Sequence, residues 1–182
     1  DEQIERMLSD EKAEALAENF VGQWLQSRDI PLIGLNEREI LRGDGILDRR
    51  SRLSRGVRRA MQAETEMSFQ HLLDNNLSLL DLLVADYTFL NKELAEFYKI
   101  EGGNHSDIRK VQLAADSYRG GILTQATILG VTSNPTRTSP VKRGLFILEN
   151  ILGTPAPPAP TNVPELEEGE KEFDENHIPR MR

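Results

Sequence analysis

The stretch DEKAEALAENFVGQWLQS, Asp10 to Ser27, decides the fold class of this 182-residue chain. Its apolar residues recur at steps of three and four positions, and most of its glutamates fall between them. This spacing predicts an amphipathic helix, which Ser9 or Asp10 can cap because a side-chain oxygen there accepts an unpaired amide hydrogen. The apolar members of the pattern are Ala13, Leu16, Ala17, Phe20, Val21, Trp24 and Leu25.

Helical spacing continues along the rest of the chain. A connecting loop rich in glycine and proline is predicted over 29–45, followed by a second helix over about 49–75. Shorter helices are predicted over 77–85, over 93–98 behind an Asn91 cap, and from 139 to a stop at Gly153, and a helix or a buried segment is predicted over 121–129. The fold class is therefore mainly α: a helical domain with long loops and an extended, proline-rich and acidic C-terminal tail.

The segment VTSNPTRTSPVKRG, residues 131–144, is basic in a chain whose formal net charge is -8. Ser139 followed by Pro140 predicts a helix start, because serine caps free amides and proline at the first helical position loses no hydrogen bond. Arg137, Lys142 and Arg143 gather near this start and are candidates for docking or anion binding. The segment therefore has a predicted structural role and a predicted charged surface.

Composition limits the possible functions. Hydrophobic residues make up 38% and charged residues 29%, and no apolar run approaches the length of a membrane span. The acidic balance argues against general affinity for nucleic acid or anionic lipid. The chain has no cysteine, which excludes disulfides, thiolate catalysis, cysteine-ligated metal and thioether-attached haem within it.

Two long segments resemble a known family. They are DYTFLNKELAEFYKI, Asp86 to Ile100, and RGGILTQATILGVTSNPTRTSPVKRGLFILENILGTPAPPAPTNVPEL, Arg119 to Leu166. Both are similar to the tandem uncharacterised domains of large secreted planctomycete cytochrome-like (planctomycete cytochrome C) multidomain proteins. The start AEALAENFVGQWLQSRDI, Ala13 to Ile30, looks like the beginning of the upstream domain.

The resemblance implies an organisation in three parts. Residues 1–112 form a helical domain like the upstream module, and residues 113–153 form the helical start of the cytochrome-associated module, packed on the first. Residues 154–182 form a proline-rich and acidic tail or linker. In the family a c-type haem motif follows such a segment, so we expect this chain to be a fragment cut just before it.

The resemblance also implies a periplasmic or extracellular protein with c-type haem in the longer polypeptide. Expected partners are the adjoining domains, a cleaved partner chain or a redox partner. Binding to nucleic acid and a transmembrane segment are not expected. The predicted function is a helical scaffold that positions a cytochrome segment for electron transfer. Two alternatives stay open: a wall of a haem oxidoreductase substrate pocket, and a carbohydrate-binding or envelope-binding module.

No nucleophile elbow, phosphate-binding glycine loop or HExxH motif is present, so no catalytic residue is assigned and the question of an enzyme stays open. Two histidine arrangements are weaker candidates. Met67 and His71 would share a helix face and could ligate haem iron, although a packed methionine beside a surface histidine is favoured. His105 lies in a loop and His177 lies beside Glu175, and neither has enough convergent ligands for a metal.

Two charged sets complete the candidates. The six arginines between residues 49 and 59 could bind phosphate. A solvated face whose arginines pair with acids is favoured, because the six residues cover more than one side of a helix. Asp81, Asp86 and Glu93 could supply a carboxylate pair for glycoside hydrolysis, but a helix cap at Asp86 is favoured. The arginine series is Arg49, Arg50, Arg52, Arg55, Arg58 and Arg59.

Overall fold

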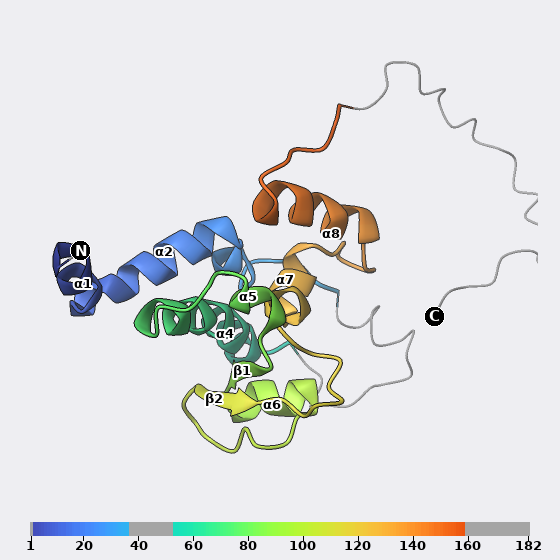
Figure 1. Cartoon of the computed structure of the whole chain (residues 1–182). Coiled ribbons are helices and arrows are strands. Elements are labelled where there is room, and N and C mark those ends of the chain that lie inside the picture. Colours follow the sequence, from blue (N-terminus) through green and yellow to red (C-terminus); the bar gives the residue numbers. More distant parts are fainter. Residues whose placement is uncertain (1, 37–52, 159–182) are drawn as a thin grey trace, which may run out of the picture.

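The computed structural model describes residues 2–36 and 53–158, and this part of the chain is mainly helical, as predicted (Figure 1). The α-helices are α1 (Glu2–Leu8), α2 (Glu14–Trp24), α4 (Arg55–Asp74), α5 (Asp81–Val84), α6 (Lys92–Tyr98), α7 (Ala126–Val131) and α8 (Pro140–Phe146). The shorter turns are η1 (Glu11–Ala13), η2 (Ser27–Asp29), η4 (Ile122–Thr124) and the π-helical η5 (Ile147–Ile151), and the strands are β1 (Tyr87–Leu90) and β2 (Arg109–Gln112).

The first predicted helix is divided into η1 and α2. Asp10 caps η1, because its Oδ1 accepts a hydrogen bond from the Lys12 amide at 3.0 Å. Val21 of α2 is fully buried, whereas Leu16 and Phe20 remain 50% and 47% exposed. The helical pattern is therefore confirmed, but part of its apolar stripe faces outward rather than into the core.

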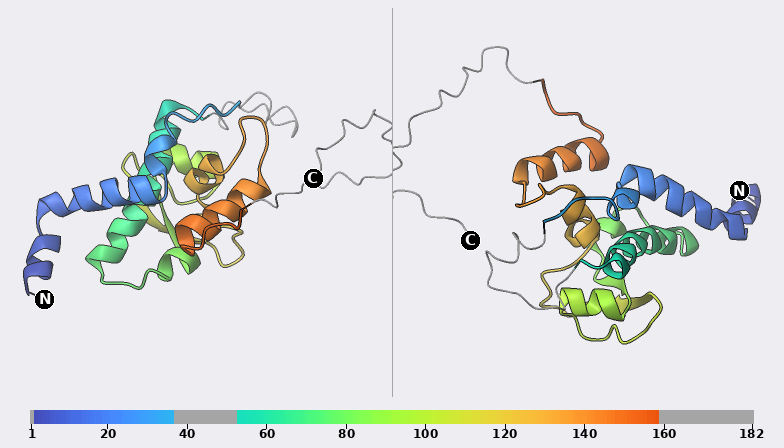
Figure 2. Two further views of the ribbon diagram at one scale, coloured as in Figure 1. Left: turned by 90° about the horizontal axis from the view of Figure 1, so that it is seen from above. Right: turned by 180° about the vertical axis from the view of Figure 1, so that it is seen from behind.

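Helix α4 is the centre of the fold and packs against α2, β1, α6 and α7 (Figures 1 and 2). It begins at Arg55 rather than near residue 49, because Ser54 caps it through a 3.0 Å hydrogen bond to the Val57 amide. Leu53 precedes the helix, and residues 49–52 lie outside the described part of the chain.

The antiparallel pair β1 and β2 was not predicted. Its register places Tyr87 opposite Gln112 and Leu90 opposite Arg109. The prediction of a helix cap at Asp86 is wrong, because a strand follows it and its carbonyl accepts from the Leu113 amide at 2.8 Å. Residues 91–108, which include α6, separate the two strands. The sequence therefore has no short turn motif that would predict their pairing.

Two apolar clusters form the core, and both include residues of α4. The first cluster unites α2, α4, α5 and the C-terminal helices, and the second unites α4, β1 and α6. The first comprises Ala17, Val21, Leu25, Phe69, Leu72, Leu82, Ile122, Ile128 and Phe146. The second comprises Ile30, Val57, Ala60, Met61, Leu90, Leu94, Ala95 and Tyr98.

The helix predicted over 77–85 is shorter than expected, and the helix predicted over 139–153 is more exposed than expected. The helix predicted over 77–85 is reduced to α5. In the last helix Phe146 is buried, but the predicted apolar positions Val141 and Leu152 are 73% and 61% exposed. Gly153 has a φ of 62°, a backbone conformation that suits the predicted glycine stop.

Candidate functional site

A carboxyl group is buried at the centre of the molecule. Glu64, in the middle of α4, is 1% exposed. The Thr88 hydroxyl donates to its Oε1 at 2.5 Å, and the Tyr98 hydroxyl donates to its Oε2 at 2.6 Å. Strand β1 and helix α6 therefore each supply one hydrogen-bond donor to the same buried side chain.

Burial decides the ionisation of this carboxyl group. Loss of hydration raises the pKa of Glu64 to about 7, although hydrogen bonds from Thr88 and Tyr98 and the charge of Arg119 act in the opposite direction. Burial and the nearby Glu64 raise the pKa of Tyr98 as well. At mildly acidic pH both groups are therefore protonated and neutral.

The same network holds the start of α7. The Tyr98 hydroxyl accepts from the Ala126 amide at 2.8 Å, and the Thr127 hydroxyl donates to the Met61 carbonyl at 2.7 Å. Gln125 accepts from Thr65 at 2.9 Å and donates to Ser68 at 2.9 Å. Buried polar groups of α4 and α6 are thus paired with residues 125–127.

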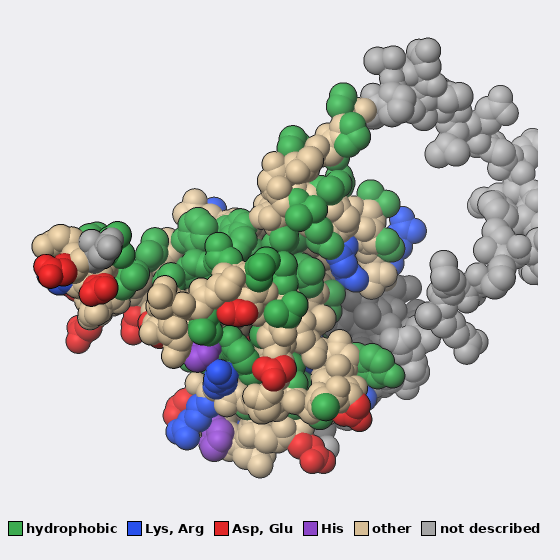
Figure 3. All heavy atoms as spheres, viewed as in Figure 1, with side chains coloured by type: hydrophobic (Ala, Val, Ile, Leu, Met, Phe, Trp, Pro, Cys, Tyr) green, Lys and Arg blue, Asp and Glu red, His purple; other side chains and the backbone are tan. Residues whose placement is uncertain are grey.

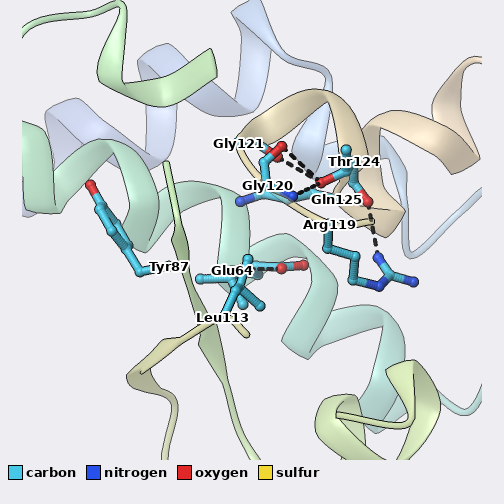
Figure 4. A pocket seen from close by; sticks show the side chains of 9 residues that line it. Glu64, Tyr87, Leu113, Arg119, Gly120, Gly121, Thr124 and Gln125 are labelled. Atoms are coloured by element: carbon cyan, nitrogen blue, oxygen red, sulfur yellow. Dashed lines mark hydrogen bonds between the residues drawn. The ribbon is translucent and has the colours of Figure 1, made fainter. Parts of the chain in front are cut away.

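Arg119 closes one side of the network (Figure 4). Its guanidinium lies 3.6 Å from the centroid of the Tyr98 ring, and its Nη1 donates to the Thr124 carbonyl at 2.9 Å. The cavity between Glu64 and Arg119 measures about 10 Å³, which is room for one water molecule and not for an organic substrate. The buried network therefore has the character of a structural centre rather than a substrate site.

The basic segment 131–144 is arranged around one cap. Ser139 Oγ accepts from the Lys142 amide at 3.3 Å, and Pro140 is the first residue of α8. Arg143 turns back and donates to Thr132 Oγ1 at 3.4 Å, whereas Arg137 and Lys142 are exposed. The three predicted docking residues therefore do not share one environment.

The histidines that were weighed as weaker ligand candidates have separate surroundings. Both ring nitrogens of His71 have partners, Asn75 at 3.0 Å and Lys110 at 2.9 Å, and burial with the Lys110 charge lowers its pKa. His105 is exposed, while His177 and Glu175 lie outside the described residues. Across residues 2–36 and 53–158 no group of three His, Asp or Glu side chains could hold a metal ion.

The arginine and carboxylate candidates have local roles. Arg58 donates to the carbonyls of Ile30 and Ile33 at 3.0 and 2.7 Å, so it holds the chain after η2 in place. Asp81 accepts from the Ser78 amide at 3.1 Å, and Glu93 lies against Gly56. Arg49, Arg50 and Arg52 lie outside the described residues, whereas Arg55 and Arg59 are exposed.

An apolar face was not predicted. Hydrophobic side chains gather over α2, α5 and α8 (Figure 3), and we call this area the apolar face. Trp24 connects its helices, because its Nε1 donates to the Asn150 carbonyl at 2.6 Å and its ring centroid lies 5.4 Å from that of Phe20. The large exposed hydrophobic residues on or within two residues of α2, α5, α8 and η5 are Leu16, Phe20, Leu79, Leu80, Val84, Val141, Leu145 and Leu152.

Comparison with family models identifies the chain. The model PSD4, described as a protein of unknown function (DUF1592), matches residues 1–100, which is more than half of the sequence. The chain belongs to this family. The model PSCyt3, described as a protein of unknown function (DUF1588), matches residues 119–181. The predicted resemblance is confirmed, since these names refer to planctomycete cytochrome C-type proteins. No curated protein and no solved structure matches the chain significantly.

The two family matches meet in the buried network. The PSD4 match contains Glu64 and Tyr98, and the PSCyt3 match contains Arg119 and Ala126. Within the described ranges, no helix combines the length and the hydropathy needed to span a bilayer.

Proposed function

We propose that this chain is a helical scaffold in a secreted, periplasmic or extracellular redox protein, where it positions an adjoining c-type cytochrome segment for electron transfer. The observation that carries the proposal is the apolar face, which includes Leu80 at 68% and Val84 at 75% exposure. Large grouped apolar side chains on a soluble protein favour contact with another protein surface. The tandem PSD4 and PSCyt3 matches favour an adjoining domain of the same polypeptide as that surface.

The residues of this chain fit the role of a neighbour to haem and not of a haem carrier. The sequence contains no cysteine to form thioether links, and the ring nitrogens of His71 are already hydrogen-bonded. The adjoining segment would therefore supply the thioether attachment. The chain would contribute a rigid surface and the exposed charges of Arg137 and Lys142, which can steer a charged partner.

The test uses a longer protein that contains the adjoining haem segment. Phe20→Asp combined with Leu80→Asp should separate the two parts, because each carboxylate would lose hydration in an apolar interface. Hydrogen exchange would then increase on the apolar face, and the rate of haem reduction would change. Tyr118→Asp is the matched control, since Tyr118 is fully exposed and is not in this group. Unchanged exchange and reduction in the double variant would refute the scaffold.

A further inference from the structure

A second concave surface lies beside the buried network, with which it shares Arg119 and Ala126. This groove has a volume of about 430 Å³, within the range of pockets that bind small organic ligands. Its lining comes from the chain after η2, from α4, α6 and α7, and from the loop before α8. The apolar lining includes Ile30, Leu35, Leu53, Met61, Phe97, Ala126 and Leu129.

Charge and polarity are distributed unevenly in this groove. Arg119 and Arg137 line it, together with the hydroxyl-bearing residues Ser133, Thr136 and Thr138. None of the described residues that line the groove is acidic, although the chain as a whole is acidic. The groove therefore combines an apolar interior with hydrogen-bond donors and two positive charges.

The arginines are held in different ways. Arg119 is fixed by its stacking on Tyr98 and by its hydrogen bond to Thr124, so little side-chain freedom remains to be lost on binding. The backbone at Arg137 is fixed because its carbonyl accepts from the Asn134 amide at 2.9 Å. Guanidinium groups bind carboxylates through paired hydrogen bonds, which favours a carboxylate over a neutral polar head.

We propose that this groove binds an organic carboxylate with an apolar body, such as a medium-chain fatty acid. The carboxylate pairs with Arg137 and Arg119, and the hydrocarbon chain lies against Leu129 and Phe97. The site is separate from the apolar face and does not depend on the scaffold function.

The test is a titration of the purified chain with decanoate, followed by methyl NMR signals of Ile30 and Leu129. Decanoate should shift these signals, whereas decanol and decyltrimethylammonium should bind more weakly because they lack the anion. Arg137→Gln should weaken decanoate binding roughly tenfold, the loss of about one charged hydrogen bond. Lys142→Gln is the matched control, because Lys142 is an exposed cation that does not line the groove.

Several outcomes would overturn the proposal. Equal binding of decanol and decanoate would mean an apolar groove without recognition of the anion. Stronger binding of decyltrimethylammonium would mean a cationic ligand. Decanoate affinity that is unchanged in Arg137→Gln and in Arg119→Gln would exclude both arginines, and methyl signals that respond to no probe would exclude a ligand site. Arg137 is exposed, so its variant stays interpretable even if Arg119→Gln fails to fold.

Discussion

The Tyr98 hydroxyl accepts a hydrogen bond from the Ala126 amide at 2.8 Å, while it donates to Glu64 at 2.6 Å. Tyr98 lies in the PSD4 match and Ala126 in the PSCyt3 match. One buried hydroxyl therefore satisfies a donor from one family module and an acceptor from the other. We expect the two modules to unfold together, because neither can separate without exposing unpaired polar groups.

Tyr98→Phe tests this connection. The substitution leaves the Glu64 carboxyl and the Ala126 amide without their shared partner, which should lower the free energy of unfolding by about 3 kcal/mol. Urea unfolding followed by circular dichroism and by the fluorescence of Trp24 would measure it, and both signals should change together. Tyr118→Phe, at a fully exposed ring, should change stability by less than about 0.5 kcal/mol. Two separate transitions in the unsubstituted chain would contradict a shared core.

Because its pKa is raised in the folded chain, Glu64 should make the free energy of unfolding depend on pH. Its pKa is about 7 in the folded chain and about 4.5 in the unfolded chain, so the folded state holds the proton more tightly between these values. The contribution of Glu64 is therefore full below about pH 4.5, falls as the pH rises, and is lost above about pH 7. The difference in pKa corresponds to about 3 kcal/mol.

Glu64→Gln isolates this effect, because glutamine has a similar shape and does not ionise. The stability of the unsubstituted chain minus that of the variant should fall between about pH 4.5 and about pH 7. Urea unfolding over this range is the measurement, and Glu96→Gln is a control at an exposed carboxyl on α6. A difference that stays constant with pH would show that Glu64 is not protonated in the folded chain.

The sequence predicts the helices better than the connections between them. Periodic apolar residues and caps such as Asn91, whose Oδ1 accepts from the Leu94 amide at 3.0 Å, are local signals. Strand β1 has no such signal, because its partner β2 lies beyond α6 and has no apolar alternation of its own. Pairing over that separation depends on tertiary packing.

The buried network left only a weak signal in the sequence. Glu64, Thr65 and Ser68 occupy inward positions of α4 between Met61 and Leu72, where a purely apolar stripe would be usual. This pattern could indicate buried polar residues, but it could not identify Tyr98 or Gln125 as their partners. The apolar face could not be predicted either. Exposed apolar residues on a helix recur with the same period as buried ones, so the sequence pattern does not distinguish them.

Gly121 predicts a strong backbone effect. Its φ is 62°, and a Cβ at this position would collide with the carbonyl oxygens of Leu82 and Leu83. Gly121→Ala should therefore lower the free energy of unfolding by at least about 2 kcal/mol. Gly144→Ala is the matched control in α8, where a Cβ meets no atom, and it should raise stability by about 0.5 kcal/mol. Thermal unfolding of both variants would decide, and equal effects would contradict the packing at Gly121.

Ser139→Ala tests the cap of α8. The Lys142 amide would lose the Ser139 oxygen, so stability should fall by about 1 kcal/mol. Ser106→Ala is a control at an exposed serine that caps no described helix. Chemical unfolding measures the difference, and a loss equal to that of the control would mean that the 3.3 Å cap contributes nothing measurable.

Replacing Arg137 and Lys142 should change the rate at which a charged partner binds, and not the stability of the fold. Both side chains are exposed, so replacing both by glutamine should leave the melting temperature nearly unchanged. In a longer protein with its haem segment, the same change should weaken the dependence of haem reduction rate on ionic strength, because long-range attraction between charges is screened by salt. Stopped-flow reduction over a series of salt concentrations is the measurement, and Arg55→Gln combined with Arg59→Gln is a control of equal charge at exposed positions of α4. An equal salt dependence in the two double variants would mean that net charge alone matters, and it would remove the docking role of the basic segment.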